Sequence, residues 1–425
     1  MTKFPPRAHA GLLIGHGKGE KMAAILDGMR IAECAAFIAC PYATMTLAEL
    51  GADVIRIDPI GGGLDYRRWP VTASGRSIYW AGLNKGKRSV RIDIKSEEGR
   101  ELAQALIAAS GIFATNLPAT GWLAPEALTA IRPDLILATI LGNHDGSTAL
   151  DYTVNCAAGF PAITGPEGSD APINHVLPAW DLLAGMSLAT AILAAERHRL
   201  RTGEGQRIRI ALSDVAFAVV SDLGYLAERQ INGTGRARHG NHIYGAFGHD
   251  FETRDGRGLM VAAVSVGQWK ALVAATGIGE RVSAYQTTRD CDLAREADRF
   301  GAREVIVEWL RPWFAARTLA EARAALDAAR ACWGPYQDVT QMLAEDPRVS
   351  TANPMFAEVV HRDLGRTLTA RTPIDFSAVA PVPPASGPVL GQHSDEVLSE
   401  LLGLDSGAIG ALHDRHIIAG PDDLK

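Results

Sequence analysis

Short apolar runs alternate, along the first part of the chain, with longer segments whose apolar residues recur at helical spacing. The runs at 29–34, 52–58, 89–94, 111–116 and 134–140 have the length and apolar character of buried strands. Between them, residues 41–51 and 97–110 show helical periodicity, with Gly51 as a C-cap. Strands that alternate with helices predict an α/β fold with a parallel sheet, which binds ligands beyond the carboxyl ends of its strands.

The pattern changes after residue 205. Residues 205–230 predict a further strand and then a long helix, and the glycine-rich segment 231–248 predicts a loop by which the chain leaves the first domain. A strand at 258–265 begins a smaller α/β region. Residues 381–403 combine a proline-rich connector with a capped amphipathic helix. We expect a disordered extension over 1–22, the first part of a large domain over 23–232, a small domain with linkers over 233–345 and a C-terminal segment over 346–425.

Composition narrows the class of protein. The chain has 425 residues, of which 47% are hydrophobic and 21% charged, and a formal net charge of −6. A charge this small for the length argues against nucleic acid or an anionic membrane surface as the main partner, and no apolar run is bounded as a membrane span would be. The five cysteines form no CxxC pair and no zinc spacing, which favours buried thiols in a reducing cytoplasm. No GxGxxG follows the first strand, so a dinucleotide cofactor is disfavoured.

The stretch PAWDLLAG, residues 178–185, places a lone carboxylate, Asp181, at the start of a long segment with helical spacing. One interpretation is an N-cap, whose oxygen accepts a hydrogen bond from a first-turn N–H. The other is a nucleophile that the same N–H groups and the helix dipole keep ionised. Taken alone, the octapeptide favours the cap.

Several motifs together cover nearly the whole chain from about residue 28. They are GADVIRID (51–58), NKGKRSVRIDI (84–94), RTGEGQRIRIALSD (201–214), LGQHSDEVL (390–398) and Asp181 itself. In order and spacing they resemble the class III CoA-transferase family, also called CaiB/BaiF. The resemblance implies a large CoA-binding domain with a Rossmann-like parallel sheet, a smaller α/β domain inserted in it, and a C-terminal segment that returns to the large domain. It also implies a homodimer whose two subunits interlock like linked rings.

The resemblance reverses the interpretation of Asp181, because this position carries the nucleophile in the family. It also places Ala39, Lys87 and Asn116 in contact with CoA. A cradle for the CoA phosphates is expected from the basic clusters, which add Arg67, Arg68, Lys85 and Arg88.

The glycine-bearing loop 239–248 stands where the family has a mobile lid, so Gly240, Tyr244 and Gly245 are candidates for it. An ordinary linker is the alternative. His175 is a candidate for orienting the free carboxylate of the substrate, with a structural histidine as the alternative.

The segments IGGGLDYRRWPVT and NHVLPAWD resemble a subgroup that moves CoA between the C1 and C4 carboxyls of mesaconate, an intramolecular transfer. The alternatives are an intermolecular transfer between two acids, an α-methylacyl-CoA racemase and a non-catalytic acyl-CoA binder. Racemases of the family pair the aspartate with a histidine, and Leu150 stands at that position here. Leucine cannot exchange a proton, which disfavours racemisation. The chemistry requires no metal and no cofactor besides the CoA of the substrate.

Overall fold

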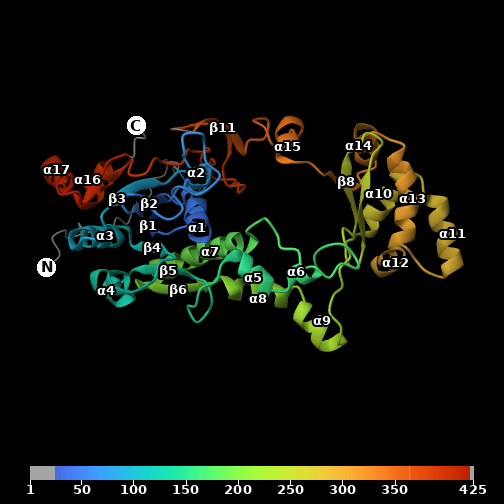
Figure 1. Ribbon diagram of the computed structural model, residues 1–425, viewed down its shortest axis with the longest axis horizontal. Coiled ribbons are helices and arrows are strands. Elements are labelled where there is room, and N and C mark those ends of the chain that lie inside the picture. The colour runs from blue at the N-terminus through green and yellow to red at the C-terminus, as the bar shows by residue number, and fades with distance from the viewer. Residues whose placement is uncertain (1–23, 363, 422–425) are drawn as a thin grey trace. The chain divides into compact units, whose positions relative to one another are not determined.

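The computed structural model describes residues 24–362 and 364–421, and the chain divides into two compact units (Figure 1). Unit 1 consists of the chain up to Ala158, the segment Val176–Leu223 and the chain from Pro347 onward. Unit 2 consists of Gly159–His175 and Gly224–Asp346. The predicted disordered extension, residues 1–22, lies outside the described residues.

Unit 1 is built on a seven-stranded sheet with the strand order β12-β3-β2-β1-β4-β5-β6. Strands β1 to β6 are parallel, and β12 pairs antiparallel with β3 at one edge. The order reverses between β1 and β4, which is the point where α/β sheets of this kind bind their ligands. The strands are β1 (Arg30–Cys34), β2 (Asp53–Asp58), β3 (Arg88–Ile92), β4 (Ile112–Thr115), β5 (Ile136–Leu141), β6 (Gln206–Ala211) and β12 (Ile418–Ala419).

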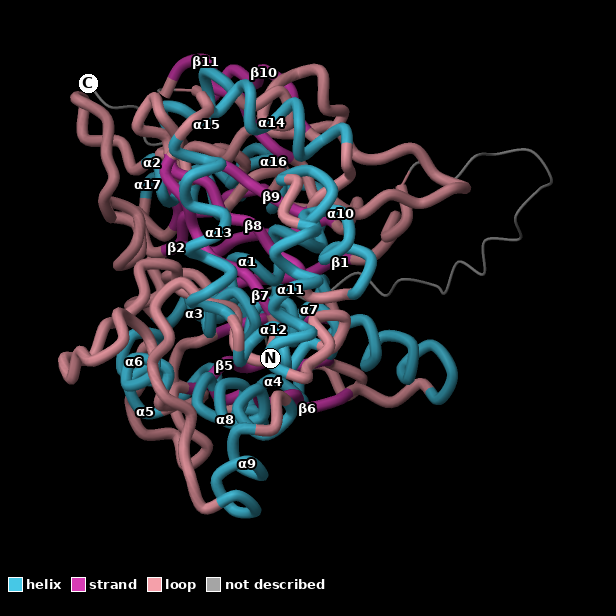
Figure 2. The backbone as a smooth tube through the Cα atoms, turned by 90° about the vertical axis from the view of Figure 1, so that its right-hand side faces the viewer, coloured by secondary structure: helices cyan, strands magenta, loops and turns pink. Residues whose placement is uncertain are grey.

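Helices pack on both faces of this sheet (Figures 1 and 2). One face carries a hydrophobic core formed by the strands with α3, α16 and α17, and the other is covered by α1 and α7. The helices of unit 1 are α1 (Ala39–Ala48), α2 (Ile78–Leu83), α3 (Glu97–Ser110), α4 (Pro125–Ile131), α5 (Asp151–Ala157), α7 (Ala179–Thr202), α8 (Leu212–Asp222), α16 (Ser394–Leu402) and α17 (Ser406–Asp414), with a short 3₁₀ turn, η1 (Gly121–Leu123). A hairpin, β10 (Phe356–His361) and β11 (Gly365–Ala370), completes the unit.

Unit 2 has its own core between a three-stranded antiparallel sheet and helices. The sheet consists of β7 (Phe247–Glu252), β8 (Gly258–Ala263) and β9 (Cys332–Pro335). The helices are α6 (Phe160–Ile163), α9 (Tyr225–Asn232), α10 (Val266–Thr276), α11 (Gly279–Arg289), α12 (Glu296–Gly301), α13 (Arg303–Ala315), α14 (Leu319–Ala328) and α15 (Val339–Glu345).

The predicted α/β architecture with a large parallel sheet is confirmed. The prediction of one long helix before residue 230 is wrong, because the structure has two helices there, α8 and α9. Gly224 separates them by adopting the left-handed conformation, with φ of 81°. Strand β7 begins inside segment 231–248, which was expected to be a loop. The sequence did not predict this strand because its glycine, histidine and aspartate interrupt the alternation of apolar and polar residues. Cys34 and Cys40 are buried, but Cys156 and Cys332 are exposed, so the expectation of buried thiols is wrong for these two.

Among the described residues, α7 is the one helix long and apolar enough to cross a membrane on length and composition alone. Within its apolar window, 39% is buried inside the protein. The helix packs closely on α1, where a Cβ atom on Gly185 would lie 2.7 Å from the carbonyl oxygen of Ala39. This close approach brings the N-terminal ends of α1 and α7 together and so positions the candidate site.

Candidate active site

Asp181 lies in the first turn of α7, but it is not the N-cap, so the interpretation that the octapeptide favours is wrong. Asp151, the first residue of α5, caps the helix instead. Its Oδ2 accepts hydrogen bonds from the backbone N–H groups of Trp180, at 2.7 Å, and of Asp181, at 3.1 Å. Because Asp151 satisfies these donors, the Asp181 carboxylate is not needed for capping.

The electrostatic environment of Asp181 differs from the expectation that the helix keeps it ionised. Burial, and then the negative charge of Asp151, raise the pKa of Asp181 to about 7, and only the guanidinium of Arg68 acts in the opposite direction. A carboxylate whose charged form is poorly solvated is a stronger nucleophile than one held by hydrogen bonds. Asp181 therefore exchanges its proton close to neutral pH and acts as a nucleophile when ionised.

An open cavity of about 310 Å³ lies at the N-terminal end of α7, against the residues that flank Asp181. Pro178 and Leu182, which flank Asp181 at the start of α7, form part of its wall. The remaining lining comes from the start of α1, the loop before α2 and α2 itself, with Ile38, Pro70, Ile78, Tyr79, Gly82 and Leu83. These side chains are almost entirely apolar, so the cavity suits a small hydrocarbon body.

The loop between β1 and α1 reaches this site from the switch point of the sheet. Asn116, which follows β4, accepts a hydrogen bond from the N–H of Ala36 and donates one to its carbonyl oxygen, at 3.0 and 2.8 Å. Phe37 adopts a positive φ of 67°, and its N–H donates to Asp65 at 3.2 Å. The hydrogen bonds of Asn116 thus join the loop after β1 to the loop after β4 at the switch point. Ala39, at the start of α1, is buried next to these loops.

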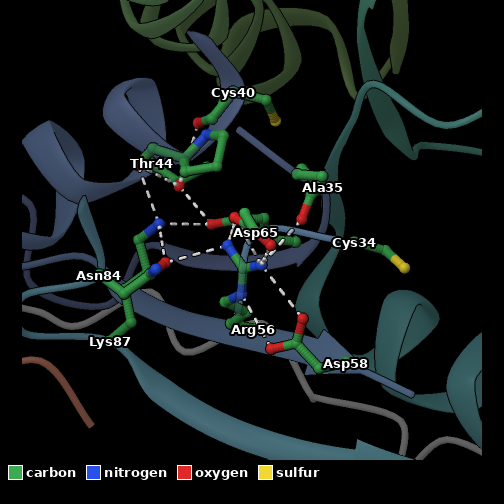
Figure 3. A network of polar contacts seen from close by, with 12 residues as sticks. Cys34, Ala35, Cys40, Thr44, Arg56, Asp58, Asp65, Asn84 and Lys87 are labelled. Carbon is green, nitrogen blue, oxygen red and sulfur yellow. Dashed lines mark hydrogen bonds and ion pairs between the residues drawn. The ribbon is translucent and has the colours of Figure 1, made fainter. Parts of the chain in front are cut away.

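A buried network of charged groups supports this loop from below (Figure 3). Its centre is Arg56 on β2, whose side chain is completely buried and forms ion pairs with Glu33, Asp58 and Asp65. Arg56 also donates to the carbonyl oxygen of Ala35 at 2.9 Å. This network was not among the predictions from the sequence, although charged residues within otherwise apolar strands, such as Glu33 and Arg56, were a visible signal of it.

Lys87, which the family resemblance predicts to contact CoA, belongs to the same network. The residue is 3% exposed, and its ammonium group donates to Glu33 Oε2 at 2.7 Å, to the Pro41 carbonyl oxygen at 2.8 Å and to Asn84 Oδ1 at 2.9 Å. Burial by itself raises the pKa of Glu33, but Lys87 and Arg56 hold it below its usual range. The three acceptors of the Lys87 ammonium group all belong to the protein.

The other expected cradle residues do not form one basic face. Lys85 pairs with Glu49 at 2.7 Å, and Arg88 pairs with Asp53 at 2.6 Å and with Glu400 at 2.7 Å. Arg67 and Arg68 are exposed, and neither forms an ion pair with a carboxylate among the described residues. Two of the five cations therefore remain available to a negatively charged ligand.

The expected lid residues and His175 all belong to unit 2. Gly240 and Gly245 both adopt left-handed conformations, with φ of 57° and 76°, which suits their expected role in backbone turns. Tyr244 donates from its hydroxyl to Glu228 at 2.9 Å and stacks on His239. No group of three or more histidine, cysteine, aspartate or glutamate side chains in the described ranges could hold a metal ion.

The comparisons with known proteins agree with this geometry. Residues 26–394 match the model of CoA-transferase family III. The chain is 51% identical to the 2-methylfumaryl-CoA isomerase of Chloroflexus aurantiacus, over 94% of this chain and 99% of that protein. It is 30% identical to the succinyl-CoA:mesaconate CoA-transferase of Haloarcula marismortui, over 90% and 97%. A crystal structure of a CaiB/BaiF family protein from Brucella suis matches with a TM-score of 0.74 and 27% identity, covering 89% of this chain and 100% of that chain. Because the family match and both relatives span almost the whole chain, this protein belongs to CoA-transferase family III.

Proposed function

We propose that this enzyme moves CoA between the C1 and C4 carboxyls of mesaconate, converting 2-methylfumaryl-CoA into 3-methylfumaryl-CoA. The name of the Chloroflexus relative, at 51% identity, supports the substrate and the intramolecular transfer. The observation that supports the mechanism is the position of Asp181, a carboxylate beside an apolar cavity and relieved of the capping role by Asp151.

The transfer proceeds through covalent adducts of Asp181. The carboxylate attacks the thioester carbonyl, the C–S bond breaks, and a mixed anhydride forms between Asp181 and the acid. The CoA thiolate then attacks the Asp181 carbonyl, which releases the free dicarboxylate and leaves CoA on Asp181 as a thioester. When the other carboxylate attacks this thioester, the same steps in reverse deliver CoA to the opposite end. Asp181 is regenerated, and no water or redox partner is consumed.

The intermediates impose two requirements on the site. Each tetrahedral intermediate needs hydrogen-bond donors for its oxyanion, and the N-cap of α1, Ile38, provides no side-chain acceptor for the first-turn N–H groups of that helix. Water must be excluded, because it would hydrolyse the anhydride. We assign the second task to a lid that contains Gly240, Tyr244 and Gly245. We assign to His175 the orientation of the free carboxylate.

The CoA part of the substrate approaches from the switch point of the sheet, where Ala39 and Asn116 lie. Arg67 is exposed and has no carboxylate partner among the described residues, which suits a contact with a CoA phosphate. Lys85, Lys87 and Arg88 act indirectly, because their charges are already paired with carboxylates.

The pKa of Asp181 sets the expected pH dependence. The nucleophile reacts only when ionised, so kcat/KM for the acyl-CoA should rise with pH and level off above an inflection near 7. In an Asp151→Asn variant the amide oxygen still accepts the two backbone hydrogen bonds, but the negative charge is gone. The inflection should therefore move to lower pH in initial-rate measurements. An inflection in the wild type at the ordinary aspartate pKa, near 4, would contradict the effect of burial.

An intermolecular transfer between two acids is the second candidate, which the name of the Haloarcula relative favours. The two candidates differ in the fate of the released acid. If the transfer is intramolecular, isotope-labelled mesaconate added to unlabelled mesaconyl-CoA should stay out of the thioester pool while the C1 and C4 isomers interconvert. Mass spectrometry of the thioesters measures the label. Entry of label at the rate of isomerisation would establish the intermolecular reaction and refute the isomerase, with Asp181 as the nucleophile in both.

We propose a homodimer of interlocked subunits in the cytoplasm. Apolar side chains exposed on α7 and α8, such as Leu183, Met186 and Phe217, support a second copy as the group that covers them. Neither a membrane nor a nucleic acid is part of this proposal. A stable folded monomer in sedimentation experiments would refute the interlocked assembly.

A further inference from the structure

Arg68 is held in a defined position at the rim of the candidate site. Its backbone N–H donates to the Asp65 carbonyl oxygen at 3.0 Å, and its carbonyl oxygen accepts from the Ser77 hydroxyl at 2.5 Å. Its guanidinium carbon lies 5.5 Å from the centre of the Phe37 ring and 5.4 Å from that of Tyr79. Aromatic contacts of this kind orient the planar guanidinium and leave N–H donors at its edge for a carboxylate.

The charge of Arg68 acts on the proposed nucleophile. Five cations were expected around CoA, and three of them, Lys85, Lys87 and Arg88, form ion pairs with carboxylates of the protein. Arg67 and Arg68 form no such pair with any described residue. Within the described part of the chain, Arg68 is the cation that acts on the Asp181 carboxylate, whose pKa it lowers against the effects of burial and Asp151. It also acts on the buried Tyr79 hydroxyl, which belongs to the cavity wall.

Among the described residues, those that line the cavity include no charged group that could hold a carboxylate. Its lining is apolar apart from the Tyr79 hydroxyl, so it accommodates the hydrocarbon body of the acyl group and leaves a second carboxylate of the substrate without a partner. A carboxylate placed against this apolar wall loses part of its hydration, and a cationic partner offsets that loss.

We propose that Arg68, rather than binding a CoA phosphate, pairs with the carboxylate of the dicarboxylic acyl group that is not being acylated, and thereby makes the site specific for dicarboxylic thioesters. The inference rests on the proposed function. In the forward half of the reaction Arg68 holds the C4 carboxylate while C1 is bonded to CoA or to Asp181. After the acid has turned end for end beside the aspartyl thioester, it holds C1. One cation thus serves both halves of an isomerisation in which the two carboxylates exchange roles.

The test compares two thioesters that differ only in the distal group. 2-Methylfumaryl-CoA carries a distal carboxylate, and (E)-2-methylbut-2-enoyl-CoA has the same skeleton with a methyl group in its place. Binding of each is measured by calorimetry in an Asp181→Asn background, in which no turnover intervenes. Arg68→Gln should weaken binding of the dicarboxylic thioester by about 10- to 100-fold, the usual range for a charge-assisted hydrogen bond, and should change binding of the methyl analogue less than about threefold.

Two further variants complete the test. Arg67→Gln, at the adjacent exposed arginine, should change the affinity for both thioesters by the same factor, as expected for a CoA contact. Arg68→Lys keeps the charge and should recover part of the discrimination, which controls for a merely structural loss. Equal weakening of both thioesters by Arg68→Gln would overturn the proposal. If the wild type discriminates between the thioesters through Arg68 but does not isomerise mesaconyl-CoA, the proposed function fails and the pairing stands.

Discussion

Replacing Asp181 by asparagine is expected to lower turnover by at least about 10⁴-fold, the scale seen when a covalent nucleophile is removed. The amide keeps the shape of the side chain but cannot attack the thioester, so binding of the acyl-CoA should persist while no adduct forms. Initial rates and mass spectrometry of the peptide that contains residue 181 measure the two effects.

Asp414→Asn, an exposed aspartate at the end of α17, is the matched control and should keep full activity. An Asp181→Asn enzyme that still turns over at more than a hundredth of the wild-type rate would contradict nucleophilic catalysis by Asp181. That result would assign the attack on the thioester to another group and would also exclude a non-catalytic acyl-CoA binder.

The same Asp181→Asn variant should be more stable than the wild type at alkaline pH. The folded-state pKa of Asp181 is raised to about 7 from its ordinary value of 3.8, so the folded protein binds this proton more tightly than the unfolded chain does. The wild type therefore loses stability as pH rises from about 4 to about 7, and the full cost remains above pH 7. With a discount for solvent, we expect the variant to gain on the order of 1 to 2 kcal/mol at pH 8 and almost nothing at pH 4.

Replacing Arg56 by methionine should destabilise the protein by about 3 to 5 kcal/mol at pH 7, because it leaves buried carboxylates without their main counter-charge. Glu33, Asp58 and Asp65 would then share only Lys87, which itself contacts Glu33 alone among them. The protonated carboxyls tolerate burial better, so the loss should become smaller as the pH is lowered. Chemical denaturation at two pH values measures it.

Arg207→Met provides the comparison within the same sheet. Arg207 lies on β6 and forms an exposed ion pair with Glu126 at 3.3 Å, a kind of pair that contributes less than about 1 kcal/mol. If Arg56→Met costs no more than Arg207→Met, the buried network is not needed for stability. If Arg56→Met folds but is inactive, the network acts through the loop that contains Ala35 and Phe37, which it holds by hydrogen bonds.

The sequence by itself determined the local structure and the family. Helix α3 agrees with its predicted bounds, and the strands of the parallel sheet lie within a few residues of theirs, because apolar periodicity reports which face of an element is buried. Asp181 could be singled out from the sequence since a carboxylate at the start of an apolar helix is visible without any tertiary contact. The motifs that identify the family are likewise local.

Only the tertiary structure decided what each charged group does. Asp151 caps α7 from 30 residues away in the chain, so Asp181 is not the expected cap, and its carboxyl has a raised pKa. In the sequence, Lys87 and Arg68 look alike, because each is a cation within a basic cluster. In the structure, Lys87 is buried against Glu33, whereas Arg68 is exposed and lies near the rings of Phe37 and Tyr79. Burial and pairing depend on segments that meet only after folding, and these two quantities set the free energy of a charge. Periodicity along the chain carries no information about them.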